Sequence, residues 1–114
     1  MTVLTEGKHT AEFILSEGNG SISREEVTID AAAGAMAAGT VVAKLANGKY
    51  TAYNNAGSGG AEIAAGVLYR AVHNLAVDQD AVIIARSAEV VNAELTGIDA
   101  AGKADLAALG IIVR

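Results

Sequence analysis

The side chains best suited to chemistry in this 114-residue chain are its two histidines and the carboxylates that follow one of them. His9 and His73 are far apart in the sequence, and His73 is followed closely by Asp78 and Asp80. A histidine with two aspartates can hold a hard or borderline metal ion, or form an acid–base pair. The same spacing is more typical of a solvated turn in which aspartates accept hydrogen bonds from nearby backbone amides.

Other candidate motifs do not favour catalysis. The segment 54–60 (NNAGSGG) is rich in glycine, but it lacks the Lys-Ser/Thr pair and the helix that complete a phosphate-binding loop, so we interpret it as a surface turn. The serines form no Gly-x-Ser-x-Gly elbow. The sequence therefore predicts neither an enzyme nor a cofactor or metal requirement. The alternative is a small ligand- or metal-binding β module that uses the His73–Asp80 loop.

Composition indicates one domain with a thin core. Apolar residues make up 52% of the chain, but 25 are alanines, which leaves 34 larger ones. Such a core favours a fold that buries further surface by association. The net charge is −5, and the eight basic residues are scattered, which argues against a nucleic-acid partner. No apolar run is long enough to span a membrane.

The pattern from residue 27 onward predicts a β-rich domain. An Asn-Gly pair at Asn47-Gly48, flanked by β-type residues, predicts a hairpin across 40–53, because both residues tolerate positive φ. Runs of β-branched residues predict further strands at 27–29, 66–72, 81–87 and 111–113, with a continuation near 90–91.

Residues 98–110 predict the one helix. Either Asp99 or Thr96 is suited to cap its start, and Gly110 lies where a left-handed residue ends a helix. Four apolar residues fall near one face at helical spacing. They are Ile98, Ala101, Leu106 and Leu109.

Residues 1–26 differ from the rest, because they are charged and contain only one apolar cluster, Phe13-Ile14-Leu15. Such a segment has too little apolar surface to order itself. We therefore interpret 1–26 as an extended N-terminal arm and 27–114 as the folded domain. An arm with one apolar cluster is suited to adding a strand to a partner's open sheet edge. A terminus with no role fits the same pattern.

Several segments, taken in order, resemble the head decoration proteins of tailed bacteriophages, the family of the lambda capsid protein D. They cover most of the chain, and their order and spacing carry the resemblance. They are EFILSEGNGSISREEVTI (12–29), AGTVVAKLANGKYTAY (38–53), AAGVLYRAV (64–72), AVIIARSAEVVNAEL (81–95) and DLAALGIIVR (105–114).

The resemblance implies a mainly β fold, a small β-barrel or tulip-like domain with one short C-terminal helix and an extended arm. It implies a protein made in the host cytoplasm that forms homotrimers and binds the outer surface of the expanded phage head at three-fold and local three-fold sites. There the trimer would stabilise the shell against the pressure of packaged DNA. It further implies that the arm adds a strand to the major capsid protein. The implied capsid-binding residues are Val3, Leu4, Phe13, Ile14 and Leu15.

Overall fold

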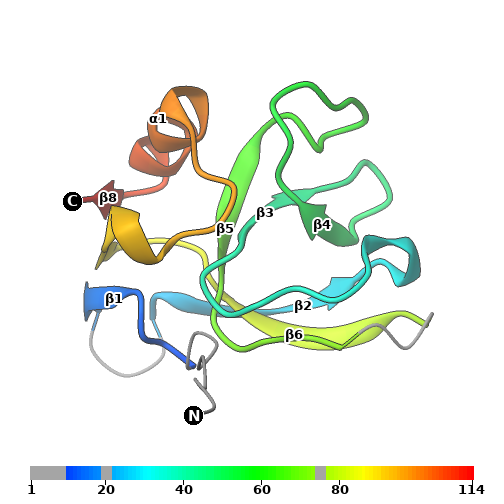
Figure 1. Ribbon diagram of the computed structural model, residues 1–114, viewed down its shortest axis with the longest axis horizontal. Coiled ribbons are helices and arrows are strands. Elements are labelled where there is room, and N and C mark those ends of the chain that lie inside the picture. The colour runs from blue at the N-terminus through cyan, green and yellow to red at the C-terminus, as the bar shows by residue number, and fades with distance from the viewer. Residues whose placement is uncertain (1–9, 19–21, 74–76) are drawn as a thin grey trace, which may run out of the picture.

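The computed structural model describes residues 10–18, 22–73 and 77–114. Their fold is mainly β, and it combines a closed five-stranded barrel with a three-stranded sheet and one short α-helix (Figure 1). The strands are β1 (Ile14–Glu17), β2 (Arg24–Ile29), β3 (Val41–Lys44), β4 (Tyr50–Ala52), β5 (Ala64–Leu68), β6 (Gln79–Ile84), β7 (Ala88–Val90) and β8 (Ile111–Val113). The helices are the 3₁₀ turns η1 (Ala31–Ala33) and η2 (Asn92–Glu94) and the helix α1 (Ala100–Ala108).

The barrel has the strand order β2-β4-β3-β5-β6 and closes through an antiparallel pairing of β2 with β6. That pairing is the longest, and it runs from Arg24 opposite Ile84 to Ile29 opposite Gln79. β3 and β4 form the predicted hairpin, with Gly48 at φ +88° in its turn. The left-handed backbone at Gly48 is the conformation for which the Asn-Gly pair is suited.

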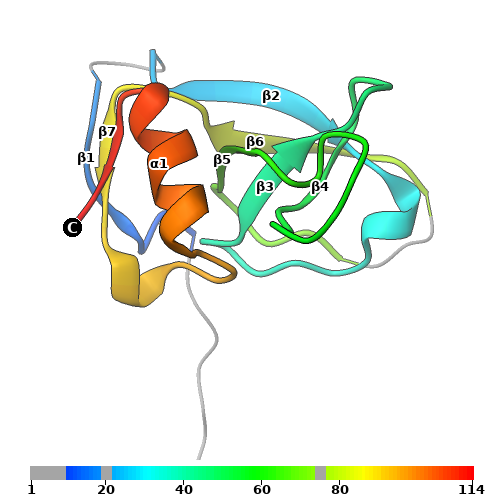
Figure 2. The same ribbon diagram turned by 90° about the horizontal axis from the view of Figure 1, so that it is seen from above.

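The three-stranded sheet has the order β1-β7-β8, with β1 antiparallel and β8 parallel to β7. α1 lies between this sheet and the barrel (Figure 2). The sheet therefore has one face turned toward α1 and the barrel, and an opposite face turned away from the rest of the domain. Among the described residues, no helix has both the length and the apolar character needed to cross a membrane.

Two separate cores hold these layers together. One fills the barrel and includes Ile29, Val42 and Leu68. The other lies between the barrel wall, α1 and the inner face of the sheet, and includes Phe13 and Leu106. Each core contains few large side chains, and these are closely packed. Replacing one of them with a smaller residue is therefore expected to lower the free energy of unfolding substantially.

α1 confirms the predicted helix and part of its predicted face, because Leu106 and Ile98 pack against the core. Asp99 caps the N-terminus by accepting a hydrogen bond from the Gly102 amide at 2.7 Å. The buried positions are Gly102 and Leu106, whereas Ala101 and Leu109 are exposed. Gly102 lies on the buried face, where a Cβ would lie 3.0 Å from the Tyr53 ring. The missing side chain lets the helix approach the barrel there, while Ala101 and Leu109 of the predicted apolar face stay exposed.

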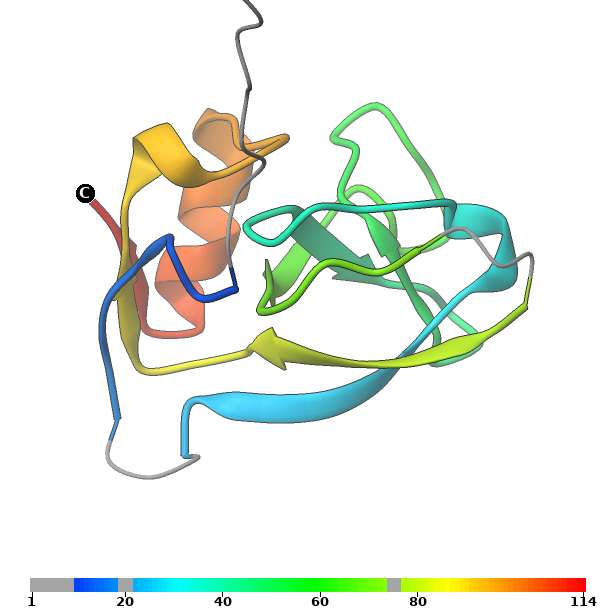
Figure 3. The same cartoon turned by 60° about the horizontal axis from the view of Figure 1, so that its bottom comes forward.

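Part of the segment interpreted as the arm pairs with the domain in this structure. Residues 10–18 and 22–26 belong to the folded domain, because β1 pairs with β7 and β2 forms the barrel wall. Figure 3 shows β1 beside the sheet strands and β2 running along β6. The apolar cluster at 13–15 finds its burial partners in residues more than 70 positions later, such as Val90 and Ile111. Sequence composition within 1–26 gives no sign of those partners.

Candidate functional site

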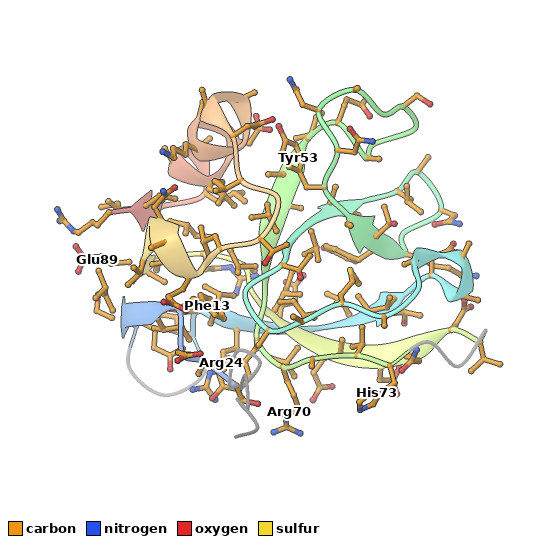
Figure 4. All side chains as sticks on the ribbon, in the orientation of Figure 1. Phe13, Arg24, Tyr53, Arg70, His73 and Glu89 are labelled. Carbon is orange, nitrogen blue, oxygen red and sulfur yellow. The ribbon has the colours of Figure 1, made fainter. Side chains whose placement is uncertain are left out.

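The root of the predicted arm is fixed to the domain at two points. The Ala11 amide donates a hydrogen bond to the Tyr69 carbonyl at 3.0 Å. Two residues later the Phe13 side chain is only 1% exposed, and Figure 4 shows it directed into the interior. The Phe13 carbonyl also accepts a hydrogen bond from the Val91 amide at 2.8 Å. Phe13 therefore packs in the domain's own core in this structure.

The other predicted capsid-binding residues have different positions. Val3 and Leu4 lie outside the described residues. Ile14 is partly buried and packs against the core between sheet and barrel. Leu15, in contrast, is 53% exposed. Of the three residues in the apolar cluster, only Leu15 presents its side chain mainly to solvent.

β1 is an edge strand. Within the described part of the chain it pairs with β7 alone, and a β-bulge interrupts the pairing between Ile14 and Ser16. An uncovered strand edge presents backbone groups that a partner strand can bind. The bulge shortens the regular stretch of that edge, which limits uncontrolled pairing with other chains.

The outer face of the β1-β7-β8 sheet carries a polar network between two exposed aliphatic side chains. The Glu89 carboxylate accepts hydrogen bonds from the Ser16 hydroxyl at 2.7 Å and from Arg114 Nε at 2.6 Å. These hydrogen bonds, with the charge of Arg114, lower the pKa of Glu89. Leu15 on β1 and Ile112 on β8, which is 49% exposed, lie on the edge strands. The face thus combines compensated charge with exposed apolar surface.

A buried serine holds the connection between the sheet and the barrel. The Ser23 side chain is fully buried, and its hydroxyl donates to the Ser87 carbonyl at 2.8 Å. The same hydroxyl accepts from the Gly18 amide at 2.7 Å. Ser87 itself has φ +51°, at the point where the chain leaves β6 for β7. The Ser23 hydroxyl therefore links the segment between β1 and β2 to the segment between β6 and β7. In both segments the chain passes between the sheet and the barrel, so this link fixes the position of the sheet.

Arg24 extends this contact on the surface. Its guanidinium donates two hydrogen bonds to the Glu17 carboxylate, the shorter at 2.6 Å, and lies 4.3 Å from the centre of the Tyr69 ring. The hydrogen bonds to Glu17 raise the pKa of Arg24. The root of the arm, the end of β1 and the start of β2 are therefore held around Tyr69.

The residues of the predicted ligand-binding loop have separate partners. Asp78 accepts a hydrogen bond from the Ala31 amide at 2.9 Å through one carboxylate oxygen and pairs with Lys49 at 2.8 Å through the other. Both interactions lower the pKa of Asp78. The His73 carbonyl accepts from the Gln79 side-chain amide, and Figure 4 shows the His73 side chain on the surface.

The described side chains bring no three metal-ligating residues together. Because both oxygens of Asp78 already have partners, this loop gives the alternative function little support. Residues 74–76 of the loop lie outside the described residues.

Tyr53 links α1 to the barrel. Its hydroxyl donates to Asp99 at 2.8 Å, the carboxylate that caps the helix. Burial and this hydrogen bond raise the pKa of Tyr53 to about 12. This pair is structural, because it joins a helix cap to the end of a barrel strand.

Sequence reasoning missed a hollow of about 440 Å³ at the C-terminal end of α1. Ile63 and Leu109 line it and are 57% and 38% exposed. Alanines, among them Ala65 and Ala108, form part of its wall. The exposure of Leu109 was not predictable from helical periodicity, because that periodicity places it on the buried face.

Comparison with protein-family models gives one finding that bears on function. The model described as bacteriophage lambda head decoration protein D matches residues 3–111, which is nearly the whole chain. A comparison with individual curated proteins gives no match. The family match agrees with the mainly β barrel and its short C-terminal helix. The chain belongs to the bacteriophage lambda head decoration protein D family.

Proposed function

We propose that this chain is a capsid-stabilising subunit that binds the outside of an expanded phage head as a homotrimer. The family match over residues 3–111 carries the proposal, since membership in a head decoration family implies a place in the virion in association with the capsid. The role is structural and needs neither catalysis nor a cofactor. A ligand that binds only one of two shell states stabilises that state by its binding free energy. Selective binding to the expanded shell would therefore oppose both contraction and rupture.

The proposed contact with the major capsid protein uses the segment before Thr10. We assign the arm to residues 1–9, with Val3 and Leu4 as its apolar residues and Leu15 as an exposed side chain near its root. This assignment is shorter than the sequence predicted, because Phe13 and β2 belong to the domain. Strand addition supplies backbone hydrogen bonds, and alternate side chains supply specificity.

Three arms on one trimer would act together. A single short segment binds weakly when it must become ordered on binding. Once one arm is bound, attachment of the second and third is intramolecular, so the trimer binds much more tightly than a monomer. The acidic net charge of −5 suits the outer face of a shell, because that face is separated from the packaged genome.

The test is co-sedimentation of the full-length chain with expanded and unexpanded shells of its own phage. We expect pelleting with expanded shells only, at three copies per three-fold site. Binding to both shell forms would retain the capsid role and overturn the selectivity. Absence of binding to either form would overturn the proposed function.

The arm is tested by deletion of residues 1–9. The shortened chain should keep the melting temperature of the full chain and lose binding to expanded shells. A double substitution, Val3→Asp with Leu4→Asp, should have the same effect, whereas the control Val77→Asp should bind normally. Val77 is a matched control because it is 56% exposed and lies outside the arm. Normal binding by the deleted chain would refute the role of the arm.

A further inference from the structure

A hollow opens on the barrel wall where β5 and β6 separate. Their regular pairing ends with Leu68 opposite Ile83. Beyond this point β6 continues beside β2, whereas the chain after β5 leaves β6 and forms a bridge between Val72 and Met36. The space between the two segments is lined from both sides and has a volume of about 550 Å³. We call it the β5–β6 hollow, and it is distinct from the hollow at the end of α1.

The proposed arm joins the domain at the rim of this hollow. Tyr69 lines the hollow, and its amide donates a hydrogen bond to the Val82 carbonyl at 2.9 Å. The Tyr69 carbonyl accepts the hydrogen bond from the Ala11 amide at 3.0 Å. Tyr69 is therefore the residue at which the backbone partner of this segment changes from β6 to the root of the arm. An extended chain spans about 3.3–3.6 Å per residue, so residues 1–9 are long enough to enter the hollow from this point.

Two carboxylates of the hollow offer a place for a cation. Glu26 on β2 and Asp80 on β6 both line it. Glu26 is opposite Val82, which shares a face with Asp80 two positions earlier on the same strand, so both carboxylates lie on one face of the β2–β6 pair. Both residues are exposed, and neither forms an ion pair with another residue that the structure describes. Like charges on neighbouring positions of a sheet face repel each other, so a cation between them would be bound favourably.

The basic residues of the hollow include one guanidinium that is available to an anion. Arg24 lines the hollow, but its guanidinium is paired with Glu17. Arg70 also lines the hollow, is exposed, and forms no ion pair within the described part of the chain. Figure 4 shows Arg24 and Arg70 on the same side of the domain. The hollow therefore offers two carboxylates and one guanidinium to a segment that enters it.

The arm carries the charges that complement this pattern. Lys8 is the only lysine or arginine among residues 1–9, and Glu6 is their only acidic residue. Residues two positions apart lie on the same face of an extended segment, so both charges can point into the hollow together. A second copy or another protein could supply such charges only by association. The arm is already attached at the rim of the hollow, which gives it a high effective concentration there.

We propose that, in the chain not bound to a capsid, the arm folds back into the β5–β6 hollow. Lys8 would lie between Glu26 and Asp80. Glu6 would lie beside Arg70. The inference goes beyond the proposed function, which concerns only the arm's contact with the capsid. Solvent-exposed ion pairs are weak, so the docked arm is favoured over the free arm only about one- to twofold. Such docking is easily reversed on a shell, and until then it keeps the arm from pairing with other exposed strand edges.

The experiment uses trypsin, because Lys8 is the only cleavage site in the arm. The rate at which the full-length chain releases residues 1–8, without shells, is divided by the rate for a synthetic peptide of residues 1–14, which has the same site and no hollow. This rate ratio should rise about two- to threefold when Glu26→Gln is combined with Asp80→Asn, because Lys8 is then free to enter the protease. It should rise by a similar factor at high salt, since salt screens exposed charges.

Two further sets of variants make the test specific. Glu62→Lys is the control, because it changes the net charge by as much as the two neutralisations together and lies outside the hollow. Its rate ratio should equal that of the wild-type chain. Glu6→Gln and Arg70→Gln should each raise the ratio, with the peptide matched to the variant. The two combined should raise it no further than either alone, because both remove the same contact.

The outcomes separate the inference from the proposed function. A rate ratio that does not rise when the carboxylates are neutralised or salt is added would overturn the inference and leave the proposed function intact, because no shell is present. A wild-type ratio that rises on dilution would show that the arm docks on a second copy, which also overturns the inference.

A second measurement, which rests on the proposed function, adds expanded shells. The variant with Glu26→Gln and Asp80→Asn should bind them about two- to threefold more tightly per arm, because none of its arms is withheld in the hollow. Weaker binding by this variant would show that the carboxylates contact the shell, and would overturn the inference. A wild-type chain that leaves expanded shells bare would overturn the proposed function alone, since the trypsin result still decides the docking of the arm.

Discussion

Phe13→Ala is expected to destabilise the domain severely, although Phe13 lies in a segment whose sequence resembles a flexible arm. The side chain is 1% exposed and packs in the core between barrel, helix and sheet. Truncation of a buried phenylalanine to alanine costs about 3–5 kcal/mol. Domains of this size have a free energy of unfolding of about 5–15 kcal/mol, so this one substitution removes a large share.

The expected shift in melting temperature follows from the length of the chain. With about 2.1 cal/mol/K of unfolding entropy per residue, each kcal/mol corresponds to roughly 4 °C for a domain of about this size. Phe13→Ala should therefore lower the melting temperature by about 12–20 °C. Leu15→Ala is the matched control, because Leu15 is two residues away and 53% exposed. Its cost should stay below about 1 kcal/mol.

The assay is urea denaturation followed by far-UV circular dichroism at one fixed protein concentration. A fixed concentration is needed because the proposed self-association would add to the apparent stability. Phe13→Ala should lower the urea midpoint without a change in m-value. A loss below about 1 kcal/mol for Phe13→Ala, or equal losses for both variants, would refute the assignment of Phe13 to the core.

Three further substitutions test other parts of the fold. Ser23→Ala should cost about 1–3 kcal/mol in urea denaturation, because it removes two hydrogen bonds of a buried hydroxyl, to the Ser87 carbonyl and from the Gly18 amide; a neutral result would contradict the role of this hydroxyl. Gly66→Ala should prevent folding or cost more than about 3 kcal/mol, because its Cβ would lie 2.6 Å from the Ile84 carbonyl oxygen; a stable, soluble variant would argue against the close approach of β5 and β6. Glu89 stabilises the fold fully above its ordinary pKa of 4.5, and its lowered folded pKa means that this contribution is lost as the pH falls through that lower value. The melting-temperature difference between wild type and Glu89→Gln should therefore shrink at acid pH, and a constant difference would count against the ion-pair network.

Local features of the fold were predictable from the sequence, and non-local ones were not. The Asn47-Gly48 turn and the Asp99 cap each depend on residues within a few positions, so their patterns are visible in a short window. Barrel closure joins β2 to β6, which are far apart in the sequence. No periodicity encodes such a pairing, and the expectation of a barrel came from the family resemblance alone.

The same difference between predictable local features and unpredictable non-local ones applies to the candidate surfaces. The apolar cluster at 13–15 was recognised, but its burial depends on Val90 and Ile111, which the sequence places far away. Leu109 is exposed at the C-cap of α1, whereas Gly102, whose lack of a side chain lets α1 approach Tyr53, lies on the buried face. Helical spacing identifies which residues share a face, but only tertiary packing decides which face is buried.

The position of Phe13 suits a domain that bears load through its N-terminal segment. Tension on a segment attached to an edge strand alone would peel the strand away one hydrogen bond at a time, because the termini of edge strands open at low free energy. Here the chain's only phenylalanine is buried immediately before β1 begins at Ile14. Tension from the proposed arm must therefore extract Phe13 from the core before β1 can separate from β7. The sheet would thereby stay in place while the proposed arm is under tension.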